Sequence, residues 1–185
     1  TNNNSAVVVH IGSSGTTAVQ NVTIKNCNLV DGTNNDLSYT SAVSVSDSSV
    51  IGSAGYFNNI TIQNNNIQKG EFGIDVLAVK STGNGSGTVI SQNLMNSTAG
   101  NALSEGGIYL EGVDGALISQ NNVGNFNAAT AEVDYGVWIA LGCRNITVDK
   151  NVIHDIRYTG TSGYTGQGLM VSTGESSANV TISNN

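Results

Sequence analysis

Three acidic residues stand at the same place in a short motif that recurs along the chain. The motif begins with a glycine and reads GIDV at 73–76, GIYL at 107–110 and GVWI at 136–139. Glu71, Glu105 and Asp134 each lie two residues before that glycine. Glycosidases use paired carboxylates, one as acid and the other as base or nucleophile. We therefore name these three residues as candidate catalytic groups, with Glu105 as the central acid and Asp134 or Asp75 as its partner.

A second set of residues in this motif suits the binding of sugars. Two residues after the glycine the chain carries Asp75, Tyr109 and Trp138, which would share the outward face of a strand with the glycine itself. Tyr and Trp combine an apolar ring face with a polar tip, and glycine in a strand permits close approach to the backbone. The predicted result is an open groove for a flat polymer. Its candidate substrate-binding residues are Trp138, Tyr109, Asp75, Gly73, Gly107 and Gly136.

Each of these features also has a plainer interpretation. A glycine that opens a strand eases the turn before it, and loops would cover Tyr109 and Trp138 as a small external core. The acids would then be solvated residues at the ends of loops. Like charges one turn apart repel each other, so three stacked acids require exposure, a shared proton or a cation. Ca²⁺ suits such oxygen ligands, and it is the one cofactor that the sequence suggests.

The elements that position these residues come from a second motif, which is written six times. It reads NVTIKNCNL at 21–29, NITIQNNNI at 59–67, TVISQNLM at 88–95, ALISQNNV at 116–123, NITVDKNVI at 145–153 and NVTISNN at 179–185. Apolar residues alternate as in a strand until a bend. The bend position is held by Cys27, Asn65, Asn93, Asn121, Asn151 and Asn185. Two strands that meet at this bend, together with the glycine-led strand, predict three strands in each turn of a solenoid.

This pattern resembles the right-handed parallel β-helix repeats of secreted polysaccharide lyases, glycoside hydrolases, epimerases and phage tailspikes. The resemblance implies an all-β, single-stranded parallel β-helix of about six rungs, with three short strands per rung and an Asn ladder at one bend. It also implies an extracellular or cell-surface protein of a bacterium. No catalytic subfamily is matched, because the polygalacturonase set is absent and the Asp-Pro-His pattern of alginate epimerases cannot occur without proline. The only arginines, Arg144 and Arg157, lie outside the glycine-led motif, unlike those of pectate lyases.

Composition and charge exclude several classes of protein. The formal net charge of −7 argues against nucleic acid as a partner, and no apolar run is long enough to span a membrane. Cys27 and Cys143 lie four turns apart in the repeat, so we expect two free thiols. We read residues 1–185 as one β-helix domain without caps, and so as a fragment of a longer protein whose other domains would be its partners.

Three functions are compatible with the sequence. The first is a carbohydrate-binding module or adhesin whose partner is a polysaccharide or surface glycan. The second is a glycoside hydrolase or polysaccharide lyase that uses Glu71, Glu105 and Asp134. The third is a structural spacer held by a secretion or assembly partner. The lack of any family catalytic set favours the first and the third.

Overall fold

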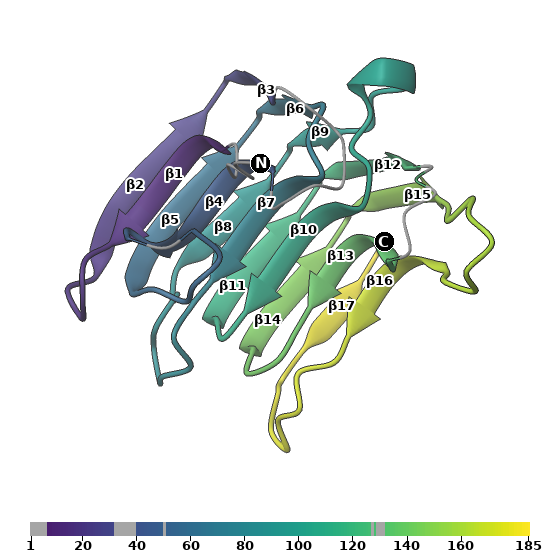
Figure 1. Ribbon diagram of the computed structural model, residues 1–185. Helices are drawn as coiled ribbons and strands as arrows, with labels where there is room; N and C mark the ends of the chain where they lie inside the picture. Colours follow the sequence, from purple (N-terminus) through teal and green to yellow (C-terminus); the bar gives the residue numbers. More distant parts are fainter. Residues whose placement is uncertain (1–6, 32–39, 50, 127, 129–131) are drawn as a thin grey trace.

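The chain winds into a parallel β-solenoid, in which each turn adds one strand to each of three sheets (Figure 1). The computed structural model describes residues 7–31, 40–49, 51–126, 128 and 132–185. Within these residues, five turns contain three strands each and a sixth turn contains two. Every pairing between the described strands is parallel. The all-β fold with three strands per turn is therefore confirmed.

The three sheets are named here after their first strands. The β1 sheet contains β1 (Val7–Ser13), β4 (Ser41–Asp47), β7 (Phe72–Leu77), β10 (Gly106–Glu111), β13 (Asp134–Ile139) and β16 (Gly166–Val171). The β2 sheet contains β2 (Val19–Lys25), β5 (Phe57–Gln63), β8 (Thr88–Ser91), β11 (Asp114–Ser119), β14 (Arg144–Asp149) and β17 (Thr181–Ser183). The β3 sheet contains β3 (Asn28–Val30), β6 (Asn66–Gln68), β9 (Leu94–Met95), β12 (Asn122–Phe126) and β15 (Val152–Ile156). One short helical segment, η1 (Ala99–Asn101), lies in the loop after β9.

The core is a stack of aliphatic side chains that runs the length of the solenoid. In the β2 sheet Ile62, Ile90 and Ile118 pair in register and have no exposed surface. In the β1 sheet Ile74, Ile108 and Val137 form the equivalent buried column. The apolar residues that alternate along these strands thus point into the core in the middle turns. Ile182 is 50% exposed, because β17 is the outermost described strand of its sheet.

An asparagine ladder closes the bend between the β2 and β3 sheets. Asn93 accepts hydrogen bonds at Oδ1 from the backbone N–H of Asn65 and from its Nδ2, each at 3.0 Å. Asn93 Nδ2 donates to the carbonyl of Ile62 at 2.9 Å and to Asn121 Oδ1 at 3.0 Å. The same pattern continues through Asn121, Asn151 and Asn185. The predicted ladder is confirmed, and it leaves the buried amides with their hydrogen bonds satisfied.

The left-handed backbone conformation of this bend falls one residue before the ladder Asn. The angle φ is positive at that preceding residue, with 52° at Asn64 and 58° at Gln92. The role of the ladder Asn is hydrogen bonding. Cys27 occupies this position in the first turn, where its backbone N–H donates to Asn65 Oδ1 at 3.0 Å. Cys27 and Cys143 are both free, as predicted.

Candidate functional site

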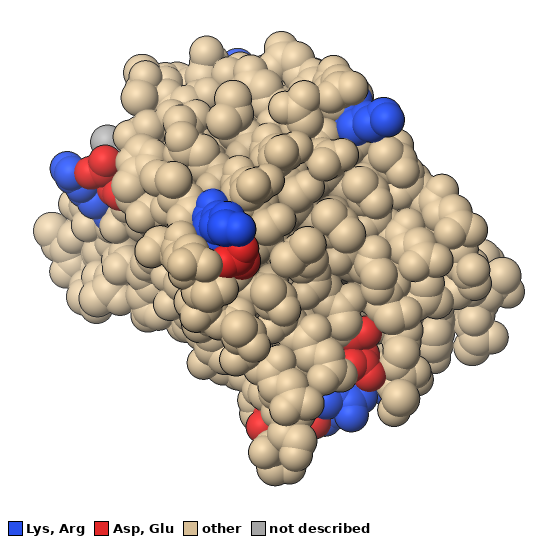
Figure 2. Space-filling model, turned by 180° about the vertical axis from the view of Figure 1, so that it is seen from behind, with Lys and Arg blue, Asp and Glu red and all other residues tan. Residues whose placement is uncertain are grey.

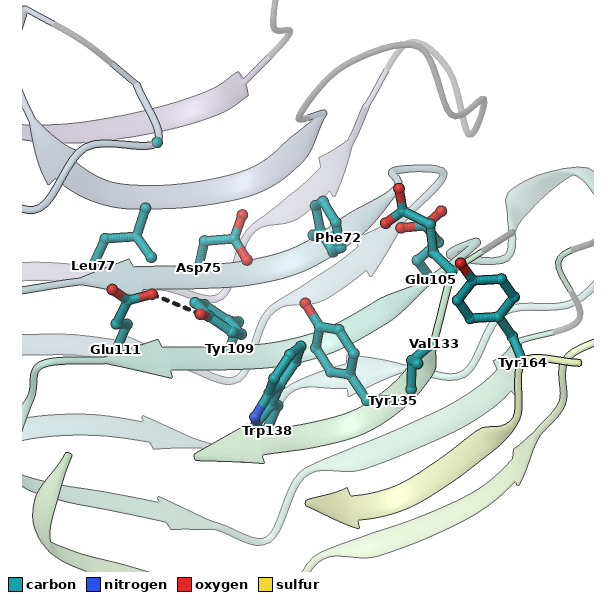
Figure 3. A pocket seen from close by; sticks show the side chains of 12 residues that line it. Phe72, Asp75, Leu77, Glu105, Tyr109, Glu111, Val133, Tyr135, Trp138 and Tyr164 are labelled. Carbon is teal, nitrogen blue, oxygen red and sulfur yellow. Dashed lines mark hydrogen bonds between the residues drawn. The ribbon is translucent and has the colours of Figure 1, made fainter. Parts of the chain in front are cut away.

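A hollow of about 480 Å³ lies on the outer face of the β1 sheet, across β7, β10 and β13 (Figure 3). Phe72, Tyr109, Tyr135 and Trp138 line it together with the exposed ring of Tyr164. The acidic side chains that line it are Asp75, Glu105, Glu111 and Glu132. The remaining lining residues that the structure describes are Gly52, Leu77 and Val133. The hollow therefore combines aromatic surface with carboxyl groups. Three of the substrate-binding residues predicted from the sequence line it together: Asp75, Tyr109 and Trp138.

The aromatic rings form one connected group. Tyr109 and Trp138 are register partners on β10 and β13, and their ring centroids lie 5.2 Å apart at an angle of 86°. Tyr135 lies 5.2 Å from Trp138 in a similar edge-to-face arrangement and 6.2 Å from Phe72, on which it stacks. Edge-to-face pairs of this kind are favourable beyond their buried area. The prediction that Tyr109 and Trp138 are adjacent is confirmed.

Hydrogen bonds fix two of the rings at their polar tips. The Tyr109 hydroxyl lies 2.6 Å from Glu111 Oε2, to which it donates (Figure 3). Trp138 Nε1 donates to the Ser172 hydroxyl at 2.7 Å. Both rings remain partly exposed. The two hydrogen bonds therefore restrict the orientation of these rings.

Phe72 and Tyr135 line the hollow, although simple alternation along their strands would point them inward. Strict alternation from Ile74 and Val137 puts residues 72 and 135 in the core and Gly73 and Gly136 on the outer face. In the structure a Cβ on Gly136 would lie 2.5 Å from the Ile153 side chain, and one on Gly107 would lie 2.4 Å from Val123. A Cβ on Gly106, in contrast, would meet the rings of Tyr135 and Phe72.

The predicted open strip of glycines is therefore wrong. A Cβ on Gly73 would meet Met95 and Leu103, which are both buried. Gly73, Gly107 and Gly136 thus face interior side chains of the neighbouring sheet, where a larger residue has no room. Two consecutive residues of each strand point inward, and this break in alternation brings Phe72 and Tyr135 to the outer face. The signal in the sequence was the aromatic residue directly after Glu71 and Asp134.

The column of three acids exists, but only one member lines the hollow. Glu105 donates its backbone N–H to the carbonyl of Glu71 at 3.0 Å, and its own carbonyl accepts the N–H of Tyr135 at 2.8 Å. Glu71, Glu105 and Asp134 therefore lie at equivalent positions in three consecutive turns, each beside the next. All three are buried. Glu71 Oε2 accepts the backbone N–H of Thr40 at 3.1 Å. Of the three proposed catalytic residues, Glu105 alone lines the hollow.

Burial changes the ionisation of two aspartates. Desolvation, with a further contribution from the charge of Glu71, raises the pKa of Asp75 to about 7. Desolvation alone raises the pKa of Asp134 to about 7. Asp134 has no exposed surface, and neither of its carboxylate oxygens has a hydrogen-bond partner among the described residues. Both carboxyls therefore retain a proton to far higher pH than an ordinary aspartate.

The described residues do not form a metal site from three or more His, Cys, Asp or Glu side chains. Among the described segments, no helix has the length and apolar character that a membrane crossing needs. Figure 2 views the molecule from behind, and the few charged side chains on that face are scattered and form no broad basic patch.

Comparisons with known proteins found no family model, no curated protein and no solved structure that matches the chain. The parallel β-solenoid is shown by the strand pairing of the structure itself.

Proposed function

We propose that the chain binds carbohydrate in the hollow on the outer face of the β1 sheet. The observation that carries the proposal is the fixed, partly exposed pair of Tyr109 and Trp138 beside Asp75 and Glu111. Aromatic rings offer apolar faces to the C–H groups of a sugar, and carboxylates accept hydrogen bonds from its hydroxyls. A concave site with a few placed polar groups is typical of ligand-binding sites in proteins.

The position of the hollow suits part of a longer polymer. It extends over three neighbouring strands, which lie about 4.8 Å apart from one to the next. A chain of sugars can therefore contact several turns and continue beyond the hollow at either end. A polysaccharide or surface glycan is the partner that this arrangement fits, and we place the binding outside the cell, as the resemblance to secreted β-helix proteins implies.

A glycan array followed by calorimetry with the bound oligosaccharide tests the proposal. We expect Trp138→Ala to weaken binding at least roughly tenfold, because it removes a stacking surface at the centre of the site. Leu117→Ala is the matched control, since Leu117 is a large, partly exposed side chain on the outer face of the β2 sheet. Equal affinity of Trp138→Ala and the parent protein would refute the proposed site.

Hydrolysis of the bound glycan is the second candidate function. It is favoured by Asp75 and Glu105, which line the same hollow, and by the proton that Asp75 retains near neutral pH. Product analysis after long incubation with the bound oligosaccharide tests it. Products that Asp75→Asn and Glu105→Gln each abolish would support hydrolysis, whereas an intact oligosaccharide would leave binding as the function.

A further inference from the structure

The hollow is acidic and receives no basic side chain. Four carboxyl groups line it, from Asp75, Glu105, Glu111 and Glu132. The whole chain has only six Lys and Arg and two His, and the structure describes all eight of them. None of the eight lines the hollow.

Four of the six Lys and Arg side chains form ion pairs elsewhere on the molecule. Lys80 pairs with Glu175, and Arg144 lies 3.6 Å from Asp114. The remaining ion pairs of Lys and Arg are Lys150 with Asp149 and Arg157 with Asp155. None of these four acids lines the hollow. No lysine or arginine within the hollow neutralises its Glu side chains, whereas Asp75, whose pKa burial raises to about 7, keeps most of its proton at pH 6 and adds little negative charge.

The aromatic group adds a second preference for positive charge. The ring planes of Tyr109 and Trp138 are almost perpendicular, and Tyr135 and Trp138 meet at 74°. All three rings line the hollow, so the aromatic group borders the space that a ligand would occupy. A ring face attracts a cation, and Trp does so most strongly. Carboxylates and ring faces together match an ammonium group better than they match a neutral hydroxyl.

We infer that the hollow selects glycan units that carry a protonated amine, as in a deacetylated amino sugar, over neutral or acidic sugars. The inference rests on the proposed function and specifies its ligand. The ammonium group would lie between the carboxylates and the faces of Trp138 and Tyr109, while the sugar ring stacks on the same aromatic group. A uronic acid polymer would bring its carboxylates against those of the hollow, and like charges brought together oppose binding.

The test compares four oligosaccharides of equal length by calorimetry at about pH 6 and low salt, where ordinary Glu side chains are ionised. They are a glucosamine oligomer, its fully N-acetylated counterpart, a cello-oligosaccharide and an oligogalacturonate. We expect the glucosamine oligomer to bind roughly tenfold tighter than either neutral ligand, as one charge-assisted contact would provide. Added salt should reduce this difference.

Two variants separate a built site from general attraction between a polycation and an acidic protein. Glu111→Gln and Asp149→Asn each remove one negative charge, but only Glu111 lines the hollow. We expect Glu111→Gln to remove most of the preference for the glucosamine oligomer and Asp149→Asn to preserve it. Equal losses in both variants would mean nonspecific attraction and would overturn the inference.

The outcomes also distinguish this inference from the proposed function. Equal binding of neutral and cationic oligomers, lost in Trp138→Ala, would overturn the selectivity and leave carbohydrate binding in place. Tighter binding of the oligogalacturonate would have the same meaning. Absence of binding by all four ligands, with an empty glycan array, would overturn both.

Discussion

Asn121 shows how a single side chain connects three turns of the solenoid. Its Oδ1 accepts the backbone N–H and the Nδ2 of Asn93, each at 3.0 Å, while its Nδ2 donates at 2.9 Å to Ile90 and to Asn151. The residue is 1% exposed, so water cannot replace these partners. A buried donor without a partner costs about 1–3 kcal/mol.

We therefore predict that Asn121→Ala lowers the free energy of unfolding by about 2–4 kcal/mol, because it removes the acceptor of the buried Asn93 backbone N–H and Nδ2 and the side-chain donor to the carbonyl of Ile90. Urea unfolding followed by circular dichroism measures the change. Asn66→Ala is the control, since the Asn66 amide makes an exposed hydrogen bond of 2.9 Å to Asn28. Losses of the same size in both variants would show that the buried ladder has no special role.

At the scale of the element, the strand β10 depends on glycine for a reason that its motif does not reveal. A Cβ on Gly107 would lie 2.4 Å from the carbonyl oxygen of Gly136 and from the Val123 side chain. We predict that Gly107→Ala destabilises the fold by about 1–3 kcal/mol, the usual effect of overpacking a core. Thermal unfolding tests this, with Gly100→Ala as the control, because a Cβ on Gly100 has nothing within 4 Å. A Gly107→Ala protein as stable as the control would place these glycines back on an open face.

The same strands show how far the sequence predicts the site. The alternation of ITIQ and the recurring bend Asn determine the β2 sheet and the ladder, because identical residues stack turn on turn. In the β1 sheet, the column of Asp75, Tyr109 and Trp138 was predicted correctly from its spacing. The roles of Phe72 and Tyr135 were not, since alternation fails at the glycines and its failure depends on Val123 and Ile153, which belong to another sheet.

At the scale of the whole molecule, stacking brings together groups that would avoid each other in an open chain. The parallel register sets Glu105 directly beside both Glu71 and Asp134 and buries all three. Stacked acids of this kind require exposure to solvent, a shared proton or a cation. Because all three side chains are buried, exposure is excluded. Retention of a proton accounts for Asp134, whose raised pKa follows from burial. At neutral pH the folded solenoid thus retains a proton on Asp134 that the unfolded chain would release to water.

This difference makes the stability of the solenoid depend on pH. The pKa values of Asp75 and Asp134 are about 7 in the folded protein, against 3.8 for an ordinary aspartate. Between about pH 4 and pH 7 the folded state holds protons that the unfolded state has lost, so the free energy of unfolding falls as pH rises through this window and levels off above it. The lowered pKa values of Asp114, Asp149 and Asp155 act only below the window.

We accordingly predict that the melting temperature declines from about pH 4 to about pH 7 and that Asp134→Asn makes the decline shallower. Asparagine keeps the size of the buried side chain but cannot ionise, so it removes one of the two groups that lose protons on unfolding. Scanning calorimetry across the window provides the measurement, with the exposed Glu132 changed to Gln as the control. A melting temperature that rises with pH across this range would mean that these aspartates are ionised in the folded stack, and that a cation or a solvent channel reaches them.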